Sequence, residues 1–151
     1  GKDLLVLEDL GSGSIIDLSK YGLSRERTVG QCLKEGIDLV SFSCDKLLGG
    51  PQGGIIVGRK DLIDQIKKNQ LLRAFRVGKL TLAALEATLF EYLDEGLLMK
   101  TNPTLRMIAM PLEEIEKKAI KLRDMILKEI PQIDLTLEDI QEMLKLLYEE
   151  V

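Results

Sequence analysis

Residues 41–58, SFSCDKLLGGPQGGIIVG, constrain the fold of this chain more than any other stretch. The apolar run at 37–42 predicts a buried strand, and residues 55–57 predict a second, short one. Between them lie a charged loop and four glycines at positions 49–54, a density typical of tight turns or of backbone close to a ligand. Lys46 ends a polar cluster, residues 43–46, just past the carboxyl end of the first strand, where ligands of open α/β sheets bind. Spacing alone nevertheless favours a solvated turn lysine, which is the commoner case.

The composition describes a globular chain and narrows its possible chemistry. The 151 residues are 45% hydrophobic and 30% charged, which fits one domain, or one domain plus part of another. No apolar run could span a bilayer, no signal peptide is visible, and two cysteines are too few for a disulfide scaffold, so we expect a cytoplasmic protein. The net charge of −4, without a basic cluster, gives no electrostatic sign of nucleic-acid binding. Because the chain has no His, we expect no metal site, and chemistry on Lys, Asp, Glu, Arg, Ser or a borrowed cofactor.

The first part of the chain predicts a strand–helix–strand unit. Residues 3–9 predict a buried strand that ends at Glu8 and Asp9, and residues 28–35 predict a helix that Gly36 stops. The GSGS sequence at 11–14 is a turn, and it lacks the lysine of a phosphate-binding loop. Strands joined in this way are parallel, with a right-handed crossover, so we expect Asp9 and Lys46 to meet at one sheet edge. The pair would form either a salt bridge or the two ends of a pyridine cofactor site, with the carboxylate at the ring nitrogen and the lysine at the aldehyde carbon.

Helices are predicted for most of the remaining chain. We expect helices at 59–69, at 80–94 with Gly96 as its end, and from Pro111 to residue 129, and a new segment beginning at Pro103. Residues 130–135 could form a short strand, and a Thr136–Asp139 capping box would open a last helix to residue 150. The third of these helices should turn five apolar residues toward a core: Leu112, Ile115, Ala119, Leu122 and Ile126.

Arg73 and Arg76 are a second candidate site. They stand three positions apart, so on a helical turn they would share one face. Such a pair can hold a phosphate-like anion in a fork, and it can equally be an exposed basic face.

Three segments, DLGSGSIIDLSKYGL, LVSFSCDKLLGGPQGGIIVG and LLRAFRVGKLTLAALEATL, resemble the bacterial selenocysteine synthase family, the L-seryl-tRNA(Sec) selenium transferases. The resemblance runs from about Leu4 to Tyr92 and is looser over 93–151. It implies an α/β fold of the aspartate-aminotransferase type, that is, pyridoxal phosphate fold type I. Residues 1–96 would then be part of the large cofactor-binding domain, and residues 97–151 an interdomain helix and an incomplete small domain. Family members are much longer, so we expect the residues that grip the cofactor phosphate and bind tRNA to lie outside this sequence.

The resemblance also implies roles for single residues. Lys46 matches the lysine that bonds to pyridoxal 5'-phosphate, and Asp45 matches an acid tied to the conversion of serine to selenocysteine. Asp9 matches the carboxylate expected at the pyridine nitrogen, with Glu8 as the other candidate.

The resemblance gives Arg73 and Arg76 the role of anion-binding arginines. The chain departs from the family pattern at two positions, with Cys44 in place of Gly and Gly78 in place of Asp. A thiol so close to Lys46 could add reactivity.

The function implied by the resemblance is the conversion of seryl-tRNA(Sec) to selenocysteinyl-tRNA(Sec), with selenium supplied by selenophosphate. The family also implies a homo-oligomer in which dimers assemble into a ring, without a membrane partner. Two alternatives stay open. One is an enzyme of the same fold that acts on a free amino acid, such as a cysteine or cystathionine lyase. The other is a catalytically inactive scaffold of that fold.

Overall fold

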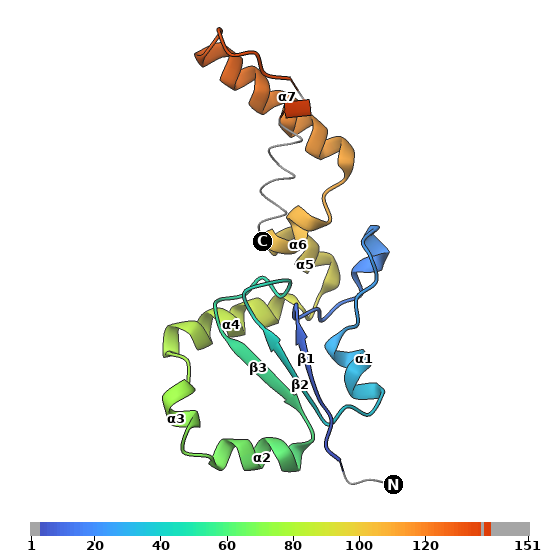
Figure 1. Ribbon diagram of the computed structural model, residues 1–151, viewed down its shortest axis with the longest axis vertical. Helices are drawn as coiled ribbons and strands as arrows, with labels where there is room; N and C mark the ends of the chain where they lie inside the picture. The colour runs from blue at the N-terminus through green and yellow to red at the C-terminus, as the bar shows by residue number, and fades with distance from the viewer. Residues whose placement is uncertain (1–3, 137, 140–151) are drawn as a thin grey trace. The chain divides into compact units, whose positions relative to one another are not determined.

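The computed structural model describes residues 4–136 and 138–139 of the chain. Its residues divide into two compact units, Gly1–Ala109 and Met110–Val151. The elements of the first unit, in chain order, are β1 (Leu7–Gly11), the 3-10 helix η1 (Leu18–Tyr21), α1 (Val29–Lys34), β2 (Leu39–Ser43), β3 (Gly54–Gly58), α2 (Lys60–Lys68), α3 (Leu72–Phe75), α4 (Lys79–Glu91), α5 (Glu95–Thr101) and α6 (Pro103–Ile108) (Figure 1). The second unit contains α7 (Leu112–Glu129).

The first unit is built on a three-stranded mixed sheet with the order β1-β2-β3. β1 and β2 are parallel, which confirms the predicted strand–helix–strand unit, and β3 runs antiparallel to β2. An antiparallel strand beside parallel ones is common in α/β sheets. The mixed α/β architecture agrees with the predicted fold class at this coarse level.

Helix α1 connects the parallel strands and covers one face of the sheet. It begins with a capping box, in which Thr28 and Gln31 exchange hydrogen bonds of 3.0 and 3.2 Å between side chain and backbone. It ends before Gly36, whose φ of +91° explains the predicted stop. Val29 and Cys32 of α1 pack on Val40 and Phe42 of β2, so alternate residues of β2 point into this core.

The first strand differs from the prediction of a buried strand at residues 3–9. β1 begins only at Leu7, and residues 4–7 have exposed side chains, with 72% exposure at Leu4. These side chains are exposed because, within the part of the chain that the structure describes, β1 is an outer strand of the sheet with a neighbour on one side only. Apolar, β-branched sequence marks a strand, but it does not tell which neighbours cover it.

The prediction that Gly96 ends the long helix is wrong. α4 ends at Glu91, and Asp94 starts a new helix, α5, by accepting hydrogen bonds from the N–H groups of Gly96 (2.9 Å) and Leu97 (3.1 Å). An N-terminal cap of this kind outweighs the low helix propensity of one glycine. Pro103 stands at the first position of α6, in agreement with the predicted new segment.

The second unit confirms one helix and corrects its surroundings. α7 ends at Glu129 as predicted, but Pro111 precedes it as the cap instead of occupying its first position. The predicted core-facing stripe is confirmed only in part. Ala119 and Ile126 are partly buried, but Leu112 and Leu122 are 78% and 51% exposed.

The stretch after α7 also differs from the prediction. Residues 130–135 form a turn and irregular backbone and not a strand, because they pair with no strand among the described residues. The Thr136–Asp139 capping box is present, with hydrogen bonds of 2.7 and 3.1 Å between backbone N–H groups and side chains. The rest of the predicted last helix lies outside the described residues.

Candidate functional site

Lys46 lies in a loop of residues 44–50, here called the Lys46 loop, at the carboxyl end of β2. The N–H of Leu47 donates a hydrogen bond to the carbonyl oxygen of Ser12 at 3.1 Å, and Ser12 belongs to the turn that follows β1. Gly13, in the same turn, lies so close to Ser43 that an added Cβ would come within 2.4 Å of its carbonyl oxygen. The turns after both parallel strands are therefore in direct contact. Among the described residues no hydrogen bond or ion pair joins Asp9 to Lys46, so the structure does not show the salt bridge that was one predicted form of this pair, and their shared cofactor site stays a prediction.

The Lys46 loop is tightly folded on itself. The N–H of Gly49 donates to the carbonyl of Lys46 at 2.9 Å, and the N–H of Gly50 donates to the carbonyl of Cys44 at 2.8 Å. Gly49 has a φ of +71°, and an added Cβ would lie 2.4 Å from Oδ1 of Asn102. Glycine is thus required at this position by conformation and by space. The side chains of Asp45 and Lys46 are exposed on this folded backbone.

Glu8 and Asp9 point to opposite faces of the sheet. In the register of β1 on β2, Glu8 pairs with Val40, whose side chain is fully buried on the α1 face. Glu8 is engaged there, because its Oε1 accepts a hydrogen bond from Arg27 at 2.7 Å. Asp9 pairs with Ser41 and accepts a hydrogen bond from its Oγ at 3.1 Å. The geometry thus leaves the Asp9 carboxylate on the face that α1 does not cover.

Cys44 is not placed for reactivity. Its side chain is 1% exposed, and burial raises the pKa of its thiol, with the charge of Asp45 adding to the effect. Because the thiolate is the reactive form, a buried thiol of raised pKa is inert. The expectation that Cys44 adds reactivity beside Lys46 is therefore wrong.

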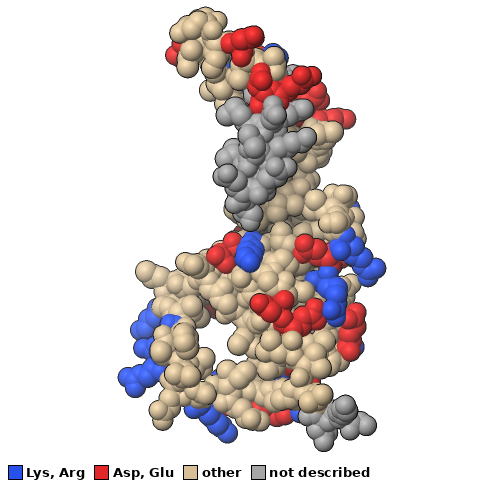
Figure 2. Space-filling model, in the orientation of Figure 1, with Lys and Arg blue, Asp and Glu red and all other residues tan. Residues whose placement is uncertain are grey.

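Arg73 and Arg76 lie in and just after the short helix α3, and the structure does not connect them to the Lys46 loop. Arg73 is inside the short helix α3, and Arg76 is the residue just beyond its end, so the predicted helical turn holds only the first of them. Both side chains are exposed. Figure 2 shows Lys and Arg side chains in blue on the part of the surface that α2 and α3 form. Within the described residues, no hydrogen bond or ion pair joins either arginine to the Lys46 loop.

Two residues that the sequence analysis did not single out hold the Lys46 loop from the helical side. Tyr92, just beyond α4, donates a hydrogen bond from Oη to the carbonyl oxygen of Leu48 at 3.0 Å. Asn102, between α5 and α6, donates to the same oxygen from Nδ2 at 3.2 Å. Asn102 precedes a proline, a pattern that indicates a helix start, but no sequence signal pairs it with a residue 54 positions earlier.

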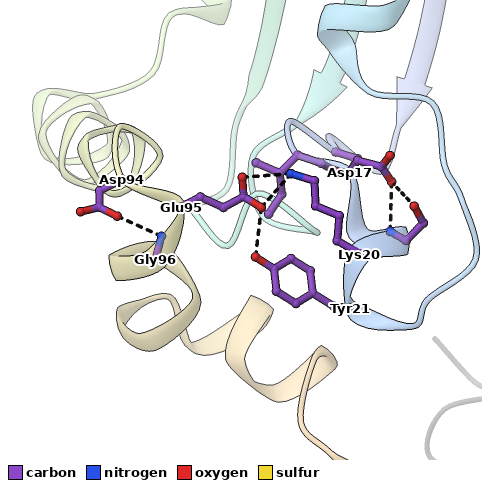
Figure 3. A network of polar contacts seen from close by, with 9 residues as sticks. Asp17, Lys20, Tyr21, Asp94, Glu95 and Gly96 are labelled. Atoms are coloured by element: carbon purple, nitrogen blue, oxygen red, sulfur yellow. Dashed lines mark hydrogen bonds and ion pairs between the residues drawn. The ribbon is translucent and has the colours of Figure 1, made fainter.

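A separate polar network connects helix α5 to η1. Glu95 of α5 accepts hydrogen bonds from Lys20 at 3.1 and 3.2 Å and from the hydroxyl of Tyr21 at 3.0 Å (Figure 3). The hydrogen bonds from Lys20 and then Tyr21 lower the pKa of Glu95. The network therefore anchors η1 on α5.

Other kinds of site find no support in the described part of the chain. No group of three His, Cys, Asp or Glu side chains there could hold a metal ion. The described helices also include none with the length and apolar content that crossing a bilayer requires.

Comparisons with known proteins identify the family. A family profile described as "L-seryl-tRNA selenium transferase" matches residues 1–145. The chain is 58% identical over 124 residues to a protein of Alkaliphilus oremlandii, covering 82% of this chain and 27% of that protein. It is 57% identical over 121 residues to a protein of Clostridium perfringens (80% and 26%) and 55% identical over 122 residues to one of Desulfomicrobium baculatum (81% and 26%). All three relatives carry the name L-seryl-tRNA(Sec) selenium transferase.

The match covers nearly all of this chain but only part of each relative. The chain spans about a quarter of the length of the curated relatives it matches. The match includes the Lys46 loop, both parallel strands and the helices that hold the loop. The chain therefore belongs to the L-seryl-tRNA selenium transferase family.

Proposed function

We propose that the complete protein converts seryl-tRNA(Sec) to selenocysteinyl-tRNA(Sec), with pyridoxal 5'-phosphate bonded to Lys46 and selenium drawn from selenophosphate. Membership of the family and the names of the relatives support this activity. The observation that carries the proposal is the hydrogen bond from Leu47 to Ser12, which joins the Lys46 loop to the turn beyond Asp9. This contact between the two turns supports a site that the Lys46 amine and the Asp9 carboxylate would share.

The donor set at this edge fits part of the cofactor. Lys46 supplies an exposed primary amine, and Asp9 supplies a carboxylate on the sheet face that α1 leaves free. When bound, pyridoxal phosphate supplies an electron sink for the carbanion at the serine Cα. Once the serine amine has replaced Lys46 on the cofactor, the freed Lys46 Nζ would take up the proton from that carbon, and Asp9 would hold a proton on the ring nitrogen. Asp45, beside Lys46, assists the departure of the serine hydroxyl.

The proposal gives Arg73 and Arg76 the task of binding the phosphate-like group of the selenium donor. Their guanidinium groups are exposed, and neither forms an ion pair with an acidic side chain among the described residues. Planar guanidinium groups match the geometry of such an anion.

The wider architecture belongs to the same proposal. Residues 1–96 would form part of a large domain of pyridoxal phosphate fold type I, and residues 97–151 an interdomain helix with part of a small domain. The mixed sheet, with the Lys46 loop and the turn after β1 in contact at the carboxyl ends of β1 and β2, supports this assignment. The complete protein would be a cytoplasmic ring assembled from dimers.

The first test concerns Lys46. The complete protein with Lys46→Ala should lose the visible absorbance of bound cofactor and the label trapped by borohydride reduction. Lys34→Ala removes another exposed lysine, in the last turn of α1, and should leave both signals intact. Retention of both signals by the Lys46→Ala protein would show that another residue bonds to the cofactor.

The second test separates the proposed reaction from its alternatives. The purified protein should transfer selenium only to serine esterified to its tRNA, and not act on free serine, cysteine or cystathionine. Arg73→Ala combined with Arg76→Ala should abolish this transfer and keep the cofactor absorbance. Lys67→Ala with Lys68→Ala, two exposed basic residues at the end of α2, is the matched control and should transfer normally. Turnover of a free amino acid would favour a lyase, and absence of cofactor would favour a scaffold.

A further inference from the structure

The carbonyl oxygen of Leu48 is the atom through which residues at the ends of α4 and α5 hold the Lys46 loop. It accepts hydrogen bonds from Tyr92 Oη at 3.0 Å and from Asn102 Nδ2 at 3.2 Å. The Leu48 side chain is fully buried, so this residue is fixed by both its backbone and its side chain. Leu48 stands two positions after Lys46 in the same turn, which means that the grip acts on the backbone from which the lysine projects.

The surroundings of Tyr92 position its hydroxyl to donate a hydrogen bond. Its ring packs against the apolar cluster of Leu18, Leu98 and Leu105, so the hydroxyl is held at a fixed distance from the loop. Burial raises the pKa of Tyr92 from 10.0 to about 12, so the neutral phenol, the form that donates a hydrogen bond, persists to higher pH. Its hydroxyl also lies 3.4 Å from the carbonyl oxygen of Leu47.

Asn102 connects the loop to two helices at once. Its Oδ1 accepts the N–H of Leu105 at 3.2 Å and so caps α6, while its Nδ2 donates to Leu48. The side chain is 1% exposed and lies against the position where Gly49 would carry a Cβ. The amide side chain can do both because its oxygen accepts at the helix start while its separate NH2 group donates to the carbonyl.

We propose that Tyr92 and Asn102 are positioning residues that fix the Lys46 loop and thereby set the reach of the Lys46 amine. Together with the bond from Leu47 to Ser12, they hold the loop from two sides, the sheet edge and the helical layer. Lys46 itself is exposed, so its own side chain gives the loop little support. A displacement of about 1 Å in a positioned group can cost a hundredfold in rate, which makes this backbone support relevant to reactivity. The link to reactivity depends on the proposed role of Lys46, whereas the grip on the loop does not.

The first experiment needs no cofactor. Amide hydrogen exchange should be measured on the complete protein without cofactor, for the wild type and the Tyr92→Phe, Asn102→Asp and Tyr21→Phe variants. Asn102→Asp keeps the oxygen that caps α6 and removes the donor to Leu48. Tyr21→Phe is the matched control, because Tyr21 packs against the same apolar cluster as Tyr92 while its hydroxyl donates to Glu95 and not to the loop (Figure 3).

The amides of Leu47, Gly49 and Gly50, which bond within and around the loop, report the result. We expect them to exchange roughly two- to tenfold faster in Tyr92→Phe and Asn102→Asp, the range that loss of one hydrogen bond produces, and to stay unchanged in Tyr21→Phe. Unchanged exchange of these amides in both test variants would overturn the proposal.

The second experiment connects the loop to the amine. Cofactor added to the protein should bond to Lys46 several-fold more slowly in Tyr92→Phe than in Tyr21→Phe, and the pH profile of the resulting absorbance should shift only in the former. If Tyr92 had a purely structural role, both variants would have a lower melting temperature but the same rate of cofactor bonding and the same pH profile. That outcome would contradict the proposal. If the wild type bonds no cofactor at Lys46, the proposed function fails, and the exchange experiment alone decides whether the loop is held.

Discussion

Ser41 Oγ donates a hydrogen bond to Asp9 Oδ1 at 3.1 Å, and this bond links the two parallel strands on the sheet face opposite α1. The adjacent acid, Glu8, points the other way and pairs with Arg27 at 2.7 Å. Two neighbouring carboxylates thus have different partners, because successive residues of a strand point to opposite faces. This arrangement separates two candidates that the sequence alone left open.

Asp9→Asn and Glu8→Gln therefore make a matched pair of variants. If Asp9 holds the proton on the pyridine nitrogen, Asp9→Asn should lower the rate of selenium transfer by about 10²- to 10³-fold, as for loss of a preorganised electrostatic partner. Glu8→Gln should retain the rate and lose at most about 1 kcal/mol of stability, since the ion pair with Arg27 is partly exposed. Steady-state rates on seryl-tRNA(Sec) and thermal unfolding measure the two effects. The opposite pattern would assign the role to Glu8.

Gly49→Ala should destabilise the protein more than Gly22→Ala does. Both glycines have positive φ, +71° and +83°, so both alanine variants pay about 1–2 kcal/mol for a left-handed backbone. An added Cβ at Gly22 meets open space, but at Gly49 it would overlap Asn102 at 2.4–2.9 Å. We expect roughly 1–3 kcal/mol of additional loss at Gly49 from this overlap. Denaturant unfolding of both variants checks the difference, and equal losses would show that Asn102 moves aside freely.

Local sequence signals predicted the strand–helix–strand unit, the helices α2 and α7 and the Lys46 loop. The helix stop at Gly36 and the glycines after Lys46 are short-range features whose meaning depends on a few neighbours. The predictions failed where a longer-range fact decides. Gly96 was expected to end a helix, but the capping carboxylate of Asp94 decides otherwise. The α7 stripe was expected to be covered, yet periodicity does not say whether a partner surface exists.

The candidate site shows the same division. The sheet-edge contact between the turns after β1 and β2 follows from the topology rule for parallel strands, so it was predictable. The grip of Tyr92 and Asn102 on Leu48 was not, because it spans 44 and 54 positions and depends on how α4, α5 and α6 pack. No local pattern encodes such a distance.

Tyr92 should give the protein a measurable alkaline instability. The fold raises its pKa from 10.0 to about 12, chiefly through burial, so the neutral phenol is favoured in the folded state. The contribution of this neutral phenol to the free energy of unfolding is complete below about pH 10 and is lost as the pH rises through about 12. Between these values the unfolding free energy of the wild type should fall more steeply with pH than that of Tyr92→Phe. Urea unfolding at intervals of pH measures both slopes, and identical slopes would contradict burial of the hydroxyl.

Gly78→Asp, which restores the residue expected from the family resemblance, should stabilise α4. Gly78 is the N-cap of that helix, with an extended backbone (φ −70°, ψ 165°) and no side chain to bond the free N–H groups. An added Cβ meets nothing within 4 Å, so an aspartate fits without strain. Its carboxylate would accept from the first turn and interact favourably with the helix dipole, for a gain of about 0.5 kcal/mol. Gly78→Ala is the control, because it adds the Cβ without an acceptor and should give no such gain. Thermal unfolding distinguishes the two, and an equal effect of both variants would mean that backbone entropy, and not capping, sets the stability of this helix start.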